Sequence, residues 1–236
     1  MKKTVAFSDI HGNYKLWEAI KNYYDKNDTI IFLGDATDRG PDGIKIMQEM
    51  FADDRVSYIL GNHEQLFLEY INEGQDEPLT LGRQALLLNG GTETIKQYME
   101  LPQQEQEELI DNLKNNTFYN IIYINKEKKN IFLSHAGCDI SSLFAVDNHS
   151  LMWDRTHLGN TAPWEPQFKY WYIVHGHTPV QNLNIGKVVL EIDKTCGGHK
   201  IDIDLGTIVS KTIAVLDLDT LKPTYFKEED GGIKIW

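Results

Sequence analysis

Short apolar runs alternate with longer amphipathic segments over the first sixty residues. Strands are predicted at Thr4–Phe7, Thr29–Leu33 and Val56–Leu60. Each run is short, is rich in residues that favour strands, and is bounded by polar or glycine-rich turns. The segments between them, Tyr14–Tyr24 and Gly43–Phe51, have the apolar spacing of helices. This order of strands and helices is typical of parallel α/β units, in which ligands bind beyond the carboxyl ends of the strands.

The pattern changes twice further along the chain. From about Glu64 to Asn116 the spacing is helical, with Asn89-Gly90-Gly91 as the clearest break, and predicts a helical insertion that could cap a site. The following part predicts short strands at Ile121–Ile124, Asn130–Leu133, Tyr170–Val174, Lys187–Ile192, His199–Ile203 and Thr212–Leu216. Residues 222–236 predict a terminal hairpin. Because no repeat or linker is visible, we expect one domain over residues 1–236.

Composition and charge narrow the class of protein. The chain has 236 residues, of which 41% are hydrophobic, and this is enough for a sizeable core. Its formal net charge of -12 argues against stable binding to nucleic acid or to anionic membrane. The sequence shows neither a secretory leader nor a long apolar run, and its cysteines, Cys138 and Cys196, are too few for a disulfide framework. We therefore expect a cytoplasmic protein.

Polar, metal-ligand types of side chain follow five of the predicted strands. The five segments are Asp9-Ile10-His11-Gly12, Gly34–Gly40, Gly61-Asn62-His63-Glu64, Ser134-His135-Ala136-Gly137 and His175-Gly176-His177-Thr178. Carboxylate, imidazole and amide oxygen donors together suit a pair of divalent ions. A single Asp or His after a strand is more often a turn or capping residue. Capping does not account for five such groups at five strand exits, so a functional site is the better interpretation.

In this order, the motifs D-x-H-G, G-D-x-x-D-R-G, G-N-H-E, H-A-G and H-G-H-T resemble the calcineurin-like metallophosphoesterases. The resemblance is to the branch that contains Ser/Thr protein phosphatases and diadenosine tetraphosphatases. The Asn89-Gly90-Gly91 turn with Thr94, the Trp153-Asp154-Arg155 triplet and Ile203-Asp204-Leu205-Gly206 are also similar to that branch. The resemblance implies an α/β fold, a four-layer αββα sandwich of two mixed β-sheets flanked by helices, with the helical insertion as a cap.

The resemblance also implies which side chains bind metal. One ion would be held by Asp9, His11 and Asp35, and a second by Asp35, Asn62, His135 and His177. Asp35 would bridge the two ions, which share a water, lower its pKa and direct the resulting hydroxide at phosphorus. We expect manganese first, while iron, zinc, cobalt or magnesium accept the same donors.

Four further residues are expected to act on the phosphate or on the leaving group. Arg39 and Arg155 match phosphate-binding arginines, whose planar forks suit two phosphate oxygens. His63 matches the catalytic residue that protonates the leaving alkoxide, and Asp38 would hold its imidazole. A Trp-flanked arginine is often a structural stacking partner, so Arg155 could have that role instead.

The remaining histidines are less clearly placed. His175 lies two residues before His177, so in an extended segment both side chains point to the same face and either could reach metal. Alignment with the family selects His177. We interpret His149, His157 and His199 as ordinary surface or loop histidines, outside the site.

The expected activity is metal-dependent hydrolysis of phosphomonoesters, on phosphorylated protein side chains or on small phosphorylated molecules, by attack of a metal-bridging hydroxide. The alternative is a bis(5'-nucleosyl)-tetraphosphatase-type hydrolase of dinucleoside polyphosphates, with a nucleotide pocket built by the middle helices. The acidic charge disfavours a phosphodiesterase or nuclease. A non-catalytic metal-binding module would be expected to lose ligands, whereas every ligand position and His63 are present. The sequence defines neither the physiological substrate nor the oligomeric state.

Overall fold

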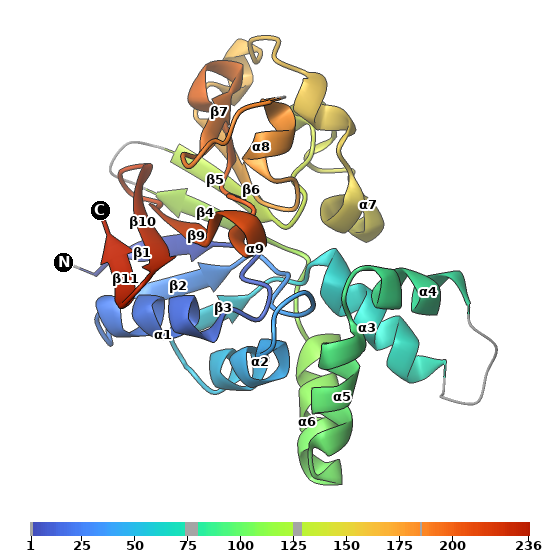
Figure 1. The fold of residues 1–236 in the computed structure, drawn as a ribbon. Coiled ribbons are helices and arrows are strands. Elements are labelled where there is room, and N and C mark those ends of the chain that lie inside the picture. Colours follow the sequence, from blue (N-terminus) through green and yellow to red (C-terminus); the bar gives the residue numbers. More distant parts are fainter. Residues whose placement is uncertain (1, 74–79, 125–128, 185) are drawn as a thin grey trace.

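Two mixed β-sheets lie at the centre of the computed structural model, which describes residues 2–73, 80–124, 129–184 and 186–236 (Figure 1). The first sheet has the strand order β11-β10-β9-β1-β2-β3. Its strands are β1 (Thr4–Phe7), β2 (Thr29–Phe32), β3 (Val56–Tyr58), β9 (Thr212–Asp217), β10 (Lys222–Glu229) and β11 (Gly232–Ile235). The first three are parallel, whereas β9, β10 and β11 pair antiparallel with their neighbours.

The second sheet has the strand order β4-β5-β6-β8-β7. Its strands are β4 (Tyr119–Ile124), β5 (Lys129–Ser134), β6 (Trp171–His175), β7 (Asp193–Thr195) and β8 (Lys200–Asp202). The three central strands are parallel, and β4 and β7 at the edges are antiparallel. Both sheets therefore present the carboxyl ends of parallel strands, which is where the motifs lie.

Helices cover the outer faces of the sheets (Figure 1). On the first sheet these are α1 (Tyr14–Tyr23) and α2 (Gly43–Phe51), and beside the second sheet α7 (Asn148–Trp153) and α8 (Val180–Leu183). Between β3 and β4 the chain forms α3 (Asn62–Asn72), α4 (Leu81–Leu88), α5 (Thr92–Glu100) and α6 (Gln103–Lys114), and α9 (Thr207–Ser210) precedes β9. Residues 74–79, within the expected helical insertion, lie outside the described residues. The expected α/β sandwich of two mixed sheets flanked by helices is confirmed.

Alternate residues of the central strands face two different cores. In β1, Val5 and Phe7 pack with the helices α1 and α2, whereas Ala6 packs between the two sheets. In β5, Ile131 joins the layer between the sheets and Phe132 faces the opposite side. Because both faces of these strands are covered, their sequences are nearly continuous apolar runs. No helix in the described ranges has the length and apolar character needed to cross a lipid bilayer.

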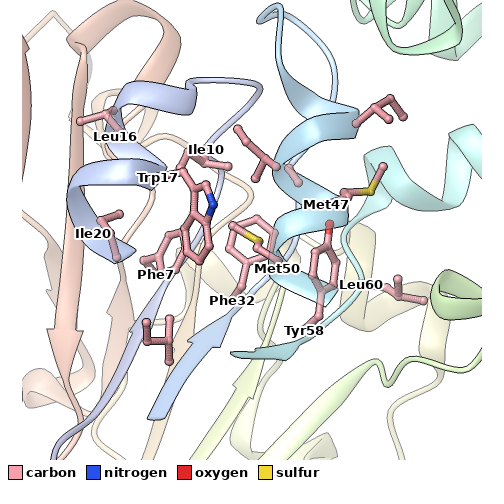
Figure 2. Close-up of a cluster of buried hydrophobic side chains, with 14 of the residues drawn as sticks. Phe7, Ile10, Leu16, Trp17, Ile20, Phe32, Met47, Met50, Tyr58 and Leu60 are labelled. Atoms are coloured by element: carbon pink, nitrogen blue, oxygen red, sulfur yellow. The ribbon is translucent and has the colours of Figure 1, made fainter. Parts of the chain in front are cut away.

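A row of aromatic side chains fixes the register of the three parallel strands in the first sheet (Figure 2). Phe7 of β1 is paired with Phe32 of β2, which is paired with Tyr58 of β3. The ring centroids of Phe7 and Phe32, and of Phe32 and Tyr58, are each 4.9 Å apart. Trp17 of α1 packs on this row, with its ring 6.2 Å from that of Phe7. Since the row lies at the carboxyl ends of the strands, it also aligns the loops that follow.

One predicted strand is wrong. Residues 187–192 have no regular structure, and the nearby strand is β7 (Asp193–Thr195). The apolar run at Val188-Val189-Leu190 is split instead, because Val188 is exposed while Val189 packs beside Val180. The side-chain amide of Gln181 donates to the carbonyl oxygen of Val189 at 2.9 Å. A side chain therefore satisfies the backbone group that a neighbouring strand would otherwise pair with.

The aromatic row predicts a large effect of truncation at its centre. Phe32→Ala should lower the free energy of unfolding by about 3–5 kcal/mol, since Phe32 is fully buried and contacts a ring on each side. Urea denaturation followed by circular dichroism measures this. Phe144→Ala is the matched control, because Phe144 is 73% exposed, and should change stability by less than about 0.5 kcal/mol. Equal losses in the two variants would contradict the assigned packing.

Candidate functional site

The loops after β1, β2, β3, β5 and β6 meet where the two sheets adjoin. The backbone N–H of His177 donates to Asp9 Oδ2 at 3.0 Å, which joins the loop after β6 to the loop after β1. The Nδ1 atom of His135 lies 2.7 Å from the carbonyl oxygen of Leu33, at the end of β2. Both contacts connect residues of different sheets. The expected site residues are thus brought together by the packing of the sheets and not by sequence proximity.

Several of these residues have left-handed backbone conformations although they are not glycine. The φ angles are 52° for Asp9, 44° for His11, 64° for Asp35, 65° for Asp38 and 70° for His177. Such residues cost about 1–3 kcal/mol each and persist only where the surrounding structure holds them. Here the loops hold one another, since the N–H of Asp9 donates to Gly34 O and that of His11 to Asp35 O, both at 3.0 Å. The strain is concentrated where the polar side chains gather.

The Asp35 carboxylate lies at the centre of the site. Its Oδ2 atom is 3.8 Å from His11 Nε2, 3.7 Å from His63 Nε2 and 3.4 Å from His135 Nε2. Two groups of closely spaced donor atoms result, one with His11 and His63 and the other with His135 and His177, and both include Asp35. Burial would raise the pKa of Asp35, but the neighbouring imidazoles hold it well below its ordinary value. The carboxylate is therefore ionised and shared between the two groups.

Backbone carbonyl groups fix the protonation of two imidazoles. His135 Nδ1 faces Leu33 O at 2.7 Å, and His11 Nδ1 faces Thr37 O at 2.8 Å. A carbonyl oxygen only accepts, so each Nδ1 carries a proton and each Nε2 faces the site, where it offers a lone pair when the ring is neutral. This is the state in which imidazole binds metal.

The second group of donor atoms fits a cation. His135 Nε2 and His177 Nδ1 are 3.1 Å apart, and Asn62 Oδ1 lies 2.9 Å from each of them. The Nε2 atom of His177 is buried and has no hydrogen-bond partner among the described residues. Burial would lower the pKa of His135, but Asp35 and Asp9 raise it to about 10, so positive charge is favoured here. The same negative charges of Asp35 and Asp9 would stabilise a bound divalent ion.

Asp9 stands slightly apart from the closest donor atoms. It is buried, its carboxylate accepts the N–H of His177, and burial with the nearby charge of Asp35 raises its pKa. It belongs to neither of the two groups of closely spaced donors within the described residues. Its contact with His177 nevertheless places it beside the second group.

The expected leaving-group and phosphate residues border the same site. His63 Nδ1 lies 2.6 Å from Asp38 Oδ2, and this bond directs His63 Nε2 toward Asp35. Burial would lower the pKa of His63, but Asp35 and Asp38 raise it above its ordinary value. The guanidinium of Arg39 lies against both rings, with one nitrogen 2.8 Å from His11 Nε2 and another 2.9 Å from His63 Nε2. Arg155 is exposed, and its Nε donates to Thr178 Oγ1 at 3.0 Å, next to His177.

The other histidines lie outside the two donor groups. The ring of His175 packs against that of His157 at 5.1 Å, and its Nδ1 lies 3.1 Å from Gly176 O. His157, expected to be a surface or loop histidine outside the site, lies in a turn and in neither donor group, but it is not at the surface, because its side chain is fully buried. His149 is exposed and stacks on Trp153. His157 is buried because the turn Thr156–Gly159 brings its ring onto that of His175, a contact that no local pattern indicates.

Glu64 has a larger role than its sequence position indicates. The sequence alone shows a carboxylate near the start of a helix, at the spacing of a capping box. In the structure its fully buried carboxylate accepts the N–H groups of Gly61 and Asp35, each at 2.9 Å, and that of Ala36 at 2.8 Å. Glu64 thereby holds the loop that carries Asp35 against the start of α3, which carries Asn62.

Sequence comparisons match this chain to a known family and to curated phosphate hydrolases. The model of the calcineurin-like phosphoesterase family matches residues 2–200. Among curated proteins, the asymmetrical bis(5'-nucleosyl)-tetraphosphatase PrpE of Halalkalibacterium halodurans is 28% identical over 215 residues, which cover 80% of this chain and 83% of the relative.

Solved structures share the fold. A protein provisionally named a diadenosine tetraphosphatase has a TM-score of 0.61 at 15% identity, over 98% of this chain and 95% of its own. A protein serine/threonine phosphatase from Saccharomyces cerevisiae has a TM-score of 0.56 at 14% identity, over 100% of this chain and 79% of its own. Because the family model covers most of its length, the chain belongs to the calcineurin-like phosphoesterases and is a hydrolase that acts on phosphoester bonds.

Proposed function

We propose that this chain uses two divalent ions to hydrolyse dinucleoside polyphosphates. The observation that carries the metal-dependent chemistry is the Asp35 carboxylate, which belongs to both groups of closely spaced donor atoms. The substrate class is supported by the similarity to PrpE, which is named for the cleavage of bis(5'-nucleosyl) tetraphosphates and is similar over 80% of this chain.

The residues that would hold the ions are those at the strand exits. Asp9, His11 and Asp35 would hold one, and Asp35 with Asn62, His135 and His177 the other. When bound, the ions would supply Lewis acidity and an acidified water next to the phosphate. The mixture of imidazole, amide and carboxylate donors supports manganese, and iron, zinc, cobalt and magnesium accept the same set.

Two arginines would bind the substrate phosphate. Arg39 lies between the imidazoles of His11 and His63, so its guanidinium borders the donor atoms directly. Arg155 is exposed beside Thr178 and would approach from the opposite loop. Their planar forks suit two phosphate oxygens, and their charge offsets the negative charge that develops in the transition state.

His63 would protonate the leaving group. Its Nδ1–H donates to Asp38, so its Nε2 faces Asp35 Oδ2 at 3.7 Å, beside the place where the phosphate would lie, and would carry the second proton of the charged ring there. Transfer of this proton would leave the ring neutral and the leaving oxygen protonated, so one less negative charge develops on the leaving group. Asp38 favours the charged ring before transfer and fixes its orientation.

Phosphomonoesters are the second candidate class. The specific observation is that the Arg39 guanidinium and the exposed Arg155 border the same donor cluster from two different loops. Such a pair can bind a terminal phosphate whatever group it is attached to. This includes a phosphorylated protein side chain or a small metabolite.

A substrate panel on metal-stripped protein tests the proposal. The stripped protein should be inactive, and one ion at a time, with Mn²⁺ expected to be the best, should restore activity. The kcat/KM for diadenosine tetraphosphate should exceed that for a phosphopeptide and for 4-nitrophenyl phosphate by at least about tenfold. A higher kcat/KM for the phosphopeptide would refute the assignment to dinucleoside polyphosphates. Full activity after stripping would refute the metal site itself.

The shared position of Asp35 predicts a loss of bound metal on neutralisation. Asp35→Asn removes the negative charge that both donor groups use, so kcat/KM should fall by more than about 100-fold, and calorimetry should show fewer or weaker bound ions. Asp54→Asn is the matched control, because Asp54 is exposed. Wild-type metal stoichiometry and rate in Asp35→Asn would rule out this role.

Glu64 should influence metal affinity without binding metal. Glu64→Gln keeps the shape of the side chain but weakens its acceptance of three backbone N–H groups, so the Asp35 loop loses its anchor. The Kd for Mn²⁺ should rise about 10- to 100-fold, as measured by calorimetry. The exposed Glu107 provides the control substitution, Glu107→Gln. An unchanged Kd in a folded Glu64→Gln protein would show that the loop keeps its position without this anchor.

A further inference from the structure

Thr94, in the first turn of α5, makes two hydrogen bonds to Asp38. Its Oγ1 donates to Asp38 Oδ1 at 2.6 Å and accepts the backbone N–H of Asp38 at 3.0 Å. Both residues are buried, with exposed fractions of 1% and 0%. The two bonds together fix the carboxylate and the backbone of Asp38, whose φ of 65° lies in the left-handed region.

The second oxygen of Asp38 faces His63. Asp38 Oδ2 lies 2.6 Å from His63 Nδ1, so Thr94, Asp38 and His63 form a continuous buried chain. The carboxylate cannot rotate about its terminal bond without breaking its bonds to both partners. Thr94 therefore determines which way Asp38 Oδ2 points, and thereby how the ring of His63 is oriented.

The turn before α5 also contacts the loop that contains Asp38. The N–H of Arg39 donates to Gly90 O at 3.3 Å. Gly90 has a φ of +91°, and a Cβ atom there would lie 3.0 Å from the backbone nitrogen of Arg39. At Gly90, the backbone between β3 and β4 therefore approaches the Asp38 loop more closely than a residue with a Cβ atom would readily allow.

A purely local role does not explain these bonds. A threonine in the first turn often caps its own helix. Here both bonds of the Thr94 hydroxyl are made to a residue 56 positions away, and α5 has no side-chain cap at its N-terminus. The hydroxyl thus acts on the loop that borders the donor cluster.

We propose that Thr94 is a positioning residue of the reaction: it orients Asp38, and through Asp38 it fixes the ring of His63, whose Nε2 faces the place where the leaving oxygen would lie. This inference rests on the proposed role of His63. It assigns a part in the reaction to the helices between β3 and β4, through a side chain that touches neither the phosphate nor the ligands.

Leaving groups of different acidity test the proposal in the Mn²⁺-loaded protein. Thr94→Val keeps the shape of the side chain but removes both bonds. The kcat for phenyl phosphate should fall about 10- to 100-fold, because phenolate needs a proton. The kcat for 4-nitrophenyl phosphate, whose leaving group needs none, should fall less than about threefold. Thr94→Ser should retain both wild-type rates, and the exposed Thr92 provides the control Thr92→Val.

Equal losses on the two esters, or a Thr94→Ser protein as impaired as Thr94→Val, would overturn the proposal. Calorimetry should give the same Mn²⁺ affinity in all variants, and a weakened affinity in Thr94→Val would likewise overturn it in favour of a purely structural role. If Thr94→Val does not fold, Thr94→Ala takes its place under the same criteria.

A spectroscopic measurement separates this inference from the proposed function. In Zn²⁺-loaded protein with ¹⁵N-labelled histidine, the Nδ1–H proton of His63 should give a downfield resonance, assigned by its loss in His63→Asn. Thr94→Val should shift or broaden this resonance, whereas Thr94→Ser should leave it unchanged. An unchanged resonance in Thr94→Val would overturn the inference. Absence of hydrolysis by the wild type on every substrate would instead overturn the proposed function, even if the resonance responds as expected.

Discussion

The site depends on the position of one buried carboxylate. Asp35 Oδ2 lies within 3.8 Å of imidazole nitrogens from two loops and from the first turn of α3, and its Oδ1 accepts the N–H of His63 at 3.1 Å. A charge in such a place is tolerated only if its surroundings are fixed in advance. Glu64 provides part of this fixation, because it accepts the N–H of Asp35. The two packed sheets, the residues with left-handed backbone conformations and the buried Glu64 carboxylate together hold the Asp35 carboxylate in place.

The helices and strands in the first half of the chain could be predicted, because the apolar positions in the sequence there are the positions that the structure buries. Strand β1 and helix α2 have the predicted bounds, since apolar runs and helical spacing directly reflect which faces are covered. The same criterion fails at Val188-Val189-Leu190, where the apolar run is divided between solvent and a small cluster near α8. Periodicity detects how much apolar surface a segment has, but not whether a neighbouring strand is available to pair with it.

The chemistry of the site was more predictable than its supporting contacts. Asp35 and His135 were predicted from their residue types at strand exits, and the structure brings both to one place, although their role in metal binding stays a proposal. The contributions of Glu64 and Thr94 were not predicted, because they act on residues 29 and 56 positions away. Such contacts follow from how the loops dock after folding. No local pattern of residue types encodes them.

The pairing of β1 with β9 has a consequence for synthesis on the ribosome. Strand β1 emerges before β9, yet one of its two edges pairs with β9, at residues 212–217. During translation that edge stays open until β9 has left the exit tunnel, and an open apolar edge is a template for pairing with other nascent chains. We therefore expect translation products that stop before β9 to expose this edge and to aggregate.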